Sequence, residues 1–352
     1  MRKVQLGKTG LMVTQLGFGG IPIQRLDERD AIAVVTRCLD LGINFIDTAN
    51  AYSTSEERIG KAIAGRRDGL ILATKSTSRS REGVIKHLEQ SLRMLGVDCI
   101  DLYQFHNVSD ARSLEMVMDP EGPRAALEEA KKAGKIKHIG ITSHQIDTAK
   151  KAVASDLFET VMFPFNFVTS DAMDELVPLA RLHDVGFIAM KPLAGGMINN
   201  ARIAFKYLFQ FSDIVSIPGI EKVEEIEEIA GLLSGQPQLT VEDTREMEQL
   251  KKQLGTRFCH RCDYCQPCKE GIAISTVMIY PSLTARLPDN QIYAGFWGSL
   301  VEKAAGCSQC GECEERCPYH LPIREMLDEH VQAYLKRKKI YEEAHPRRDC
   351  AG

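Results

Sequence analysis

The sequence lacks any apolar run close to the roughly 18 residues that a membrane-spanning helix needs, so it predicts no span. The first residues, Met1 to Gly7, lack the apolar core of a signal peptide, and a cytoplasmic protein is therefore expected. The formal net charge is only −4, which argues against nucleic acid or a membrane surface as a partner. Disulfides are rare in the cytoplasm, so the eleven cysteines need another explanation.

Apolar residues, in contrast, are abundant in the chain. A hydrophobic share of 44% beside a charged share of 26% excludes general disorder. Its 352 residues correspond to about two domains of roughly 150 residues each. The cysteines are unevenly placed, because only Cys38 and Cys99 precede residue 259. This shift in composition indicates that the last third of the chain is a separate module.

The first two-thirds alternates short apolar runs with helical patterns. Val84 to Leu95, for example, has apolar residues at a helical period. Eight runs have the composition of buried strands: 16–20, 43–49, 69–76, 99–106, 138–143, 160–166, 186–193 and 214–219. Eight such units favour an α/β fold of the (β/α)8 TIM-barrel type over an open doubly wound sheet. Before them, Lys3–Leu6 and Met12–Leu16 predict a β-hairpin that could plug the lower end of the barrel.

The cysteines of the last third form two runs with regular spacing. The eight residues are Cys259, Cys262, Cys265, Cys268, Cys307, Cys310, Cys313 and Cys317. The second run and the following Pro318 have the C-x2-C-x2-C-x3-C-P spacing of bacterial ferredoxins, which bind [4Fe-4S] clusters. Zinc suits this spacing poorly, since its knuckles usually supply two cysteines each. Disulfides are disfavoured by the compartment.

Two clusters with exchanged fourth ligands are the preferred interpretation. One cluster would take the first three cysteines of the first run with Cys317, and the other would take Cys307, Cys310 and Cys313 with Cys268. The first run departs from the ferredoxin pattern because Lys269 stands where proline is usual. One cluster with a vestigial second therefore remains an alternative.

These patterns divide the chain into four parts. We expect a barrel over 1–233, a linker with an extra helix over 234–256, a small, mainly α-helical ferredoxin-type iron–sulfur domain over 257–335, and a charged tail over 336–352. The tail is expected to fray from about Tyr334.

Polar residues follow three consecutive strands of the expected barrel. Asp47 ends the second strand and Tyr52 follows it, Lys75 ends the third, and His106 ends the fourth. Barrel enzymes carry their chemistry at these strand ends. This set contains an acid, a base and two groups that can shift their pKa values, which indicates a catalytic site. A buried Asp–Lys pair alone is often only structural.

The same segments resemble the aldo-keto reductase family. Ile46–Tyr52 resembles the signature around the family's catalytic Asp and Tyr, Ala73–Lys75 the segment with the catalytic Lys, and Asp101–His106 the segment with the catalytic His. Gly17–Gly20 and Ser216–Gly219 also match in order. The resemblance covers about residues 1–233, and some family members carry a ferredoxin-type extension.

The resemblance implies an NAD(P)H-dependent oxidoreductase that interconverts a carbonyl and an alcohol. Tyr52 would be the general acid, and Lys75 would stabilise its phenolate and lower the tyrosine pKa from about 10. Asp47 would hold Lys75 charged, and His106 would orient the carbonyl oxygen.

Cofactor contacts are also implied by the resemblance. They fall on Gly19, Thr142, Ser143, Asn166, Met190, Lys191, Leu193, Gly195, Gly219 and Glu228. The chain departs from the family at Met190, where an aromatic residue stacks on nicotinamide, and at Glu225, where an arginine often clasps the 2′-phosphate. A carboxylate repels a phosphate, so the sequence leans to NADH over NADPH, although Lys222 lies nearby.

Two functional interpretations remain open at this stage. In the first, a small-molecule carbonyl or alcohol is converted in the barrel, and the clusters exchange electrons with a flavoprotein or ferredoxin partner. In the second, the iron–sulfur module is a structural or docking domain whose metal ligation replaces a thin hydrophobic core, without redox coupling to a barrel that acts as a reductase or scaffold.

Overall fold

A computed structural model describes residues 1–235, 238–255 and 257–346. The chain divides into two compact units, Met1–Glu248 and Gln249–Gly352. In the described part of the chain, no helix combines the length and apolar character required to cross a bilayer.

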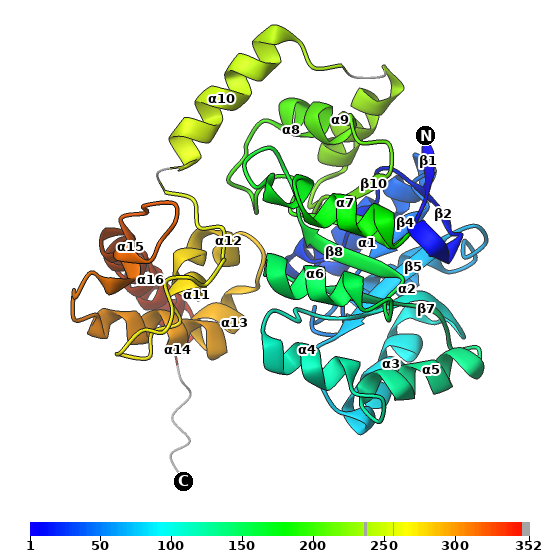
Figure 1. Ribbon diagram of the computed structural model, residues 1–352, viewed down its shortest axis with the longest axis horizontal. Helices are drawn as coiled ribbons and strands as arrows, with labels where there is room; N and C mark the ends of the chain where they lie inside the picture. Colours follow the sequence, from blue (N-terminus) through cyan, green and yellow to red (C-terminus); the bar gives the residue numbers. More distant parts are fainter. Residues whose placement is uncertain (236–237, 256, 347–352) are drawn as a thin grey trace. The chain divides into compact units, whose positions relative to one another are not determined.

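The first unit is a near-closed barrel of eight parallel strands with helices outside it, as the sequence predicted (Figure 1). The strands pair in chain order and are β3 (Phe18–Gly19), β4 (Phe45–Asp47), β5 (Ile71–Ser76), β6 (Ile100–Phe105), β7 (Ile136–Thr142), β8 (Thr160–Pro164), β9 (Gly186–Met190) and β10 (Ile214–Ile217). Parallel bridges join Leu16 to Ser216 and Gly19 to Gly219, where β10 meets β3. All eight expected strands are therefore present.

The helices that cover the strands follow the expected alternation, with one addition. They are α1 (Glu28–Asp40), α2 (Ser55–Ile63), α3 (Arg81–Leu95), α4 (Ala111–Met118), α5 (Pro123–Lys132), α6 (Ile146–Ala154), α7 (Leu176–Leu182), α8 (Ala201–Leu208) and α9 (Val223–Ser234). The connection after β6 holds both α4 and α5, where the sequence analysis expected a single helix. Short 3-10 turns lie at Pro22–Arg25 and Asp171–Met173.

The N-terminal hairpin closes the lower end of the barrel. Strand β1 (Lys3–Gln5) pairs antiparallel with β2 (Met12–Thr14) across the 3-10 turn Gly7–Thr9. Val4, Leu6 and Val13 are buried in one cluster with inward-facing residues of six of the eight barrel strands. The hairpin and its role as a plug are thus confirmed.

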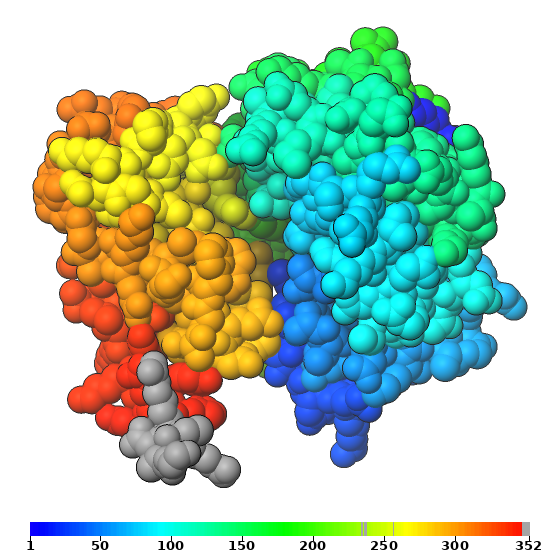
Figure 2. Space-filling model, turned by 90° about the horizontal axis from the view of Figure 1, so that it is seen from below, coloured from blue at the N-terminus to red at the C-terminus, as the bar shows by residue number. Residues whose placement is uncertain are grey.

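The second unit is helical. After α10 (Val241–Gly255), which is the expected extra helix, come α11 (Ile274–Met278), α12 (Tyr280–Thr284), α13 (Asp289–Tyr293), α14 (Phe296–Lys303), the 3-10 turn Ala304–Gly306, α15 (Glu312–Glu315) and α16 (Ile323–Ala344). In the space-filling view, the yellow-to-orange segments and the red α16 form one closely packed body (Figure 2).

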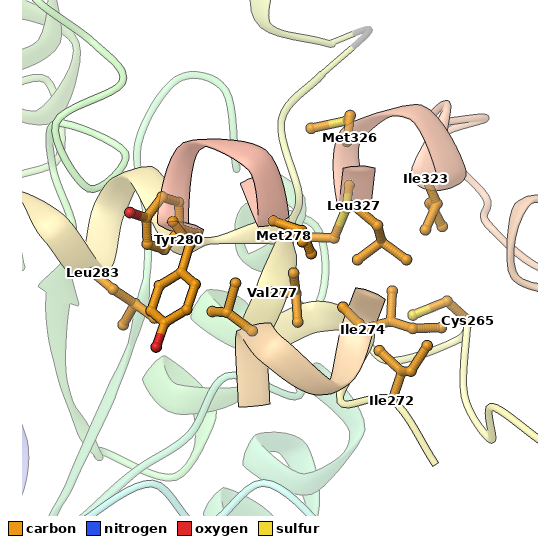
Figure 3. Close-up of a cluster of buried hydrophobic side chains, with 14 of the residues drawn as sticks. Cys265, Ile272, Ile274, Val277, Met278, Tyr280, Leu283, Ile323, Met326 and Leu327 are labelled. Atoms are coloured by element: carbon orange, nitrogen blue, oxygen red, sulfur yellow. The ribbon is translucent and has the colours of Figure 1, made fainter. Parts of the chain in front are cut away.

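Two expectations for this unit are wrong. The fraying tail was expected from about Tyr334, but α16 continues to Ala344, and Tyr334 is buried against Tyr293. The core is also not thin. Ile274, Val277 and Met278 of α11 lie against Leu327 of α16 in a continuous apolar cluster (Figure 3). Residues 347–352, including Cys350, lie outside the described residues.

Candidate active site and cysteine clusters

The four proposed catalytic side chains lie at one end of the barrel. Asp47 ends β4, Lys75 is the penultimate residue of β5, and His106 directly follows β6. Tyr52 lies in the loop between β4 and α2. Because β4, β5 and β6 are adjacent and parallel, their carboxyl ends meet at the same edge.

Lys75 is the centre of this group and is 2% exposed. Its Nζ donates hydrogen bonds to the carboxylate of Asp47 and, at 2.6 Å, to the backbone oxygen of Thr48. The same Nζ lies 5.0 Å from the centroid of the Tyr52 ring. Gln104 donates from Nε2 to the other Asp47 oxygen at 3.0 Å.

Burial opposes the charge on Lys75, but the electrostatic pull of Asp47 and Tyr52 outweighs it and raises the pKa of this lysine. Burial raises the pKa of Asp47, and the ammonium of Lys75 opposes that rise. The lysine is therefore held as an ammonium beside the tyrosine.

His106 lies edge-on to Tyr52, with ring centroids 5.6 Å apart and planes at 85°. Burial and the positive charges of Lys75 and Arg79 lower the pKa of His106 to about 3. Its Nδ1 atom is buried and has no hydrogen-bond partner among the described residues. The imidazole is therefore neutral near pH 7.

Most of the expected cofactor residues lie at or just after strand ends on the same rim of the barrel, but several side chains already have protein partners. Asn166 donates from Nδ2 to the backbone oxygen of Lys191 at 3.0 Å and accepts from the backbone of Val168 and Thr169. Thr142 accepts from the backbone N–H of Asn107 at 2.7 Å. These side chains shape the loops after β6, β8 and β9.

Ser143 is buried and bonds to the backbone of Gln145. Gly19 lies so close to Pro218 that a Cβ would be 2.8 Å from its backbone oxygen. After Met190, which ends β9, the backbone is left-handed at Lys191, at Ala194 and at Gly195, the last two just after Leu193. Such turns can form anion-binding concavities.

The Glu228 side chain is exposed on α9 and forms no hydrogen bond or ion pair with the described residues. Glu225 has a defined position at the start of this helix. Its Oε2 atom accepts from the backbone N–H groups of Glu221 at 2.9 Å and Lys222 at 3.2 Å. Glu225 therefore occupies donors at the helix N-terminus that an anionic ligand would otherwise use.

The eight cysteines of the two runs gather around two small cavities. Cys259, Cys262, Cys265 and Cys317 line one cavity, and Cys268, Cys307, Cys310 and Cys313 line the other. These are the two sets that an exchange of fourth ligands requires. Ile274 lines both cavities and lies beside Cys265 in Figure 3.

The thiols of each set line a cavity and are not arranged around a single metal ion. Over the described ranges, no group of three or more His, Cys, Asp or Glu side chains is arranged to hold one metal ion. Four thiolates on one zinc ion would each lie about 2.3 Å from it. In a cubane each thiolate binds a different iron atom, so the sulfurs stand further apart. The donor set and its arrangement fit such a cluster.

Two residues of this site, Gln104 and Arg79, were not predicted from the sequence. Gln104 lies inside an apolar strand, and an interior polar residue at that position was the available signal. Arg79 belongs to a polar loop between β5 and α3, where nothing in the sequence distinguishes it from the neighbouring arginine.

Comparison with known proteins places this barrel in a class of oxidoreductases. The aldo/keto reductase family model matches residues 15–202, more than half of the chain, and the chain belongs to this family. A model described as a 4Fe-4S dicluster domain matches residues 258–322. Both expected resemblances are confirmed.

Individual relatives agree with this assignment. The aldo-keto reductase YhdN of Bacillus subtilis is 28% identical over 233 residues, which cover 61% of this chain and 68% of YhdN. The holo form of aldo-keto reductase AKR11C1 from Bacillus halodurans superimposes with a TM-score of 0.62 at 25% identity, covering 71% of this chain and 96% of that one. An aldo-keto reductase from Klebsiella pneumoniae in complex with NADPH shares the fold, with a TM-score of 0.62 at 20% identity over 71% and 95% of the two chains.

The lowered pKa of His106 predicts an imidazole that stays neutral down to pH 5. The ordinary pKa of histidine is 6.5. Below that pH, His106 binds a proton in the unfolded chain but not in the folded chain. His106 therefore makes folding less favourable as the pH falls from about 6.5 towards 3.

Nitrogen-15 NMR of labelled histidine measures this titration, with the signal assigned by its loss in His106→Asn. We expect no titration of His106 between pH 8 and 5. A midpoint near 6.5 would contradict the electrostatic description of the site.

Proposed function

We propose that the barrel interconverts a small-molecule carbonyl and its alcohol with a nicotinamide cofactor, and that Tyr52 is the general acid. The observation that carries this proposal is the chain from Asp47 to Lys75 to Tyr52. The lysine Nζ is bonded to the buried carboxylate on one side and lies 5.0 Å from the tyrosine ring centroid on the other.

The pKa of His106 separates the roles of the two rings. A histidine with a pKa of about 3 is neutral at pH 7, and its remaining N–H is too weak an acid to protonate the substrate oxygen, which supports Tyr52 as the acid. Loss of the Tyr52 proton leaves a phenolate, which the Lys75 ammonium stabilises. The neutral His106 is left to form a hydrogen bond with the substrate oxygen and orient it.

Bound reduced nicotinamide supplies the hydride in this chemistry. The left-handed turn after β9 supports a site for its phosphates, and the Klebsiella pneumoniae relative was solved with NADPH. The Glu225 carboxylate accepts hydrogen bonds from two backbone N–H groups at the start of α9 and adds a negative charge there. This arrangement favours NADH, which has no 2′-phosphate, over NADPH.

Removing the phenol oxygen tests the assigned acid. Tyr52→Phe keeps the ring beside Lys75 but removes the proton, so kcat should fall by at least about 100-fold, the scale of a lost general acid. Steady-state kinetics with NADH and a panel of aldehydes measures this. Tyr207→Phe, in the same barrel, is the matched control. Turnover that survives in Tyr52→Phe would show that the proton comes from another group.

We propose that each cysteine set holds a [4Fe-4S] cluster, and that the two clusters supply one-electron transfer when bound. The lining of the two cavities supports two clusters over one with a vestigial second. Such thiolate sites suit a reducing compartment, and we place the protein in the cytoplasm.

The electron partner of the clusters is proposed to be a flavoprotein or a ferredoxin. Nicotinamide exchanges two electrons as a hydride, whereas a cubane exchanges one, so a mediator is needed between them. Cys310 is exposed, whereas the other seven cysteines of the two sets are buried or half-buried, which brings its cluster to the surface of the unit. The extensive apolar core argues against clusters whose purpose is to replace one.

Iron and sulfide analysis of anaerobically purified protein tests the cluster assignment. The wild type should hold about eight of each per chain. Cys268→Ala and Cys317→Ala should each lose one whole cluster, with distinct EPR signals remaining, whereas Cys99→Ala should lose none. Four iron atoms in the wild type, or the same signal surviving in both cluster variants, would rule out the paired arrangement.

A further inference from the structure

Arg79 lies in the loop that joins β5, which carries Lys75, to α3. Its Nη2 atom donates to the backbone oxygen of His106 at 2.6 Å. Its Nη1 atom donates to the backbone oxygens of Thr77 at 3.1 Å and Ser78 at 3.3 Å. These bonds fix the guanidinium beside the residue that borders the proposed carbonyl site.

Arg79 forms no ion pair with any carboxylate of the described residues. Among the described residues, no carboxylate lies within 4.0 Å of its guanidinium. Burial lowers the pKa of Arg79, and Asp110 opposes this only in part. The Asp110 carboxylate is exposed and caps α4 through the backbone and hydroxyl of Ser113, both at 2.8 Å.

Arg79 differs from the other basic side chains of the site, Lys75 and His106, in its charge and pairing. Lys75 is paired with Asp47 and His106 is uncharged, so Arg79 is the cation of this group that has no ion-paired carboxylate among the described residues. The side chain is half-buried, and its hydrogen bonds go to neutral backbone oxygens, so they bring no opposite charge to the guanidinium. A guanidinium has five N–H donors, of which three are used here, and its fork matches a carboxylate or phosphate.

We propose that the substrate carries an anionic group, a carboxylate or a phosphate, which pairs with Arg79 while its carbonyl oxygen lies between Tyr52 and His106. This inference rests on the proposed carbonyl chemistry and adds the substrate class to it. The hydrogen bond to the backbone of His106 holds the guanidinium at the edge of the proposed carbonyl site, so oxo acids and phosphorylated aldehydes are the classes that fit.

Pairs of aldehydes with and without an anionic group can test whether Arg79 binds the substrate or only holds its loop. The probes are para-carboxybenzaldehyde with its methyl ester, and glyceraldehyde phosphate with glyceraldehyde. In the wild type, kcat/KM should favour the anionic member of at least one pair. In Arg79→Gln this preference should fall at least about tenfold, the scale of one lost charge-assisted hydrogen bond.

Two further variants serve as controls. Arg79→Lys keeps the charge and should retain most of the preference. Arg81→Gln removes an exposed arginine that pairs with Glu129 at 2.8 Å and should leave the preference intact. The two pairs distinguish a carboxylate from a phosphate as the anion. An equal loss of kcat/KM for charged and uncharged members in Arg79→Gln would overturn the proposal.

A binding measurement keeps this test independent of turnover. If the wild type converts none of the aldehydes, the proposed reaction fails, but calorimetry with para-carboxybenzaldehyde still examines the anchor. Binding should weaken at least about tenfold in Arg79→Gln and remain in Tyr52→Phe. Equal affinity in the wild type and Arg79→Gln would reject the anchor itself.

Discussion

The buried ion pair between Lys75 and Asp47 is the interaction on which the candidate site depends. Both side chains are almost fully withdrawn from water, so their charges persist only because each faces the other and is hydrogen-bonded further. Removing one member of such a pair costs about 3–5 kcal/mol, because the remaining charge is left buried and unpaired. The pair therefore constrains β4 and β5 and aims the ammonium at Tyr52.

The barrel explains why residues so far apart in sequence meet. Its strands pair in chain order, so successive strand ends contribute successive groups to one rim. The helical unit brings distant residues together in another way, because each cavity is lined by cysteines of both runs. Cys268 and Cys317 each line the cavity of the other run, which links the two cysteine runs, and Ile274 lines both cavities.

Much of this architecture could be predicted from the sequence, because periodicity and spacing are local properties. The eight strands, the hairpin plug and the two cysteine runs follow from such patterns. The second helix after β6 and the length of α16 could not, because helix continuation past Tyr334 depends on tertiary packing against Tyr293. Arg79 could not be predicted for a similar reason, because its role follows from its hydrogen bond to His106 and from the absence of an ion-paired carboxylate among the described residues.

The most direct test of the central claim is the titration of Tyr52 itself, followed by carbon-13 NMR of the labelled tyrosine ring. The comparison is between the wild type and the double variant Lys75→Met/Asp47→Asn, which removes both charges and so leaves neither buried alone. The account predicts that the Tyr52 phenol ionises at a lower pH in the wild type than in the double variant. The same midpoint in both proteins would contradict it.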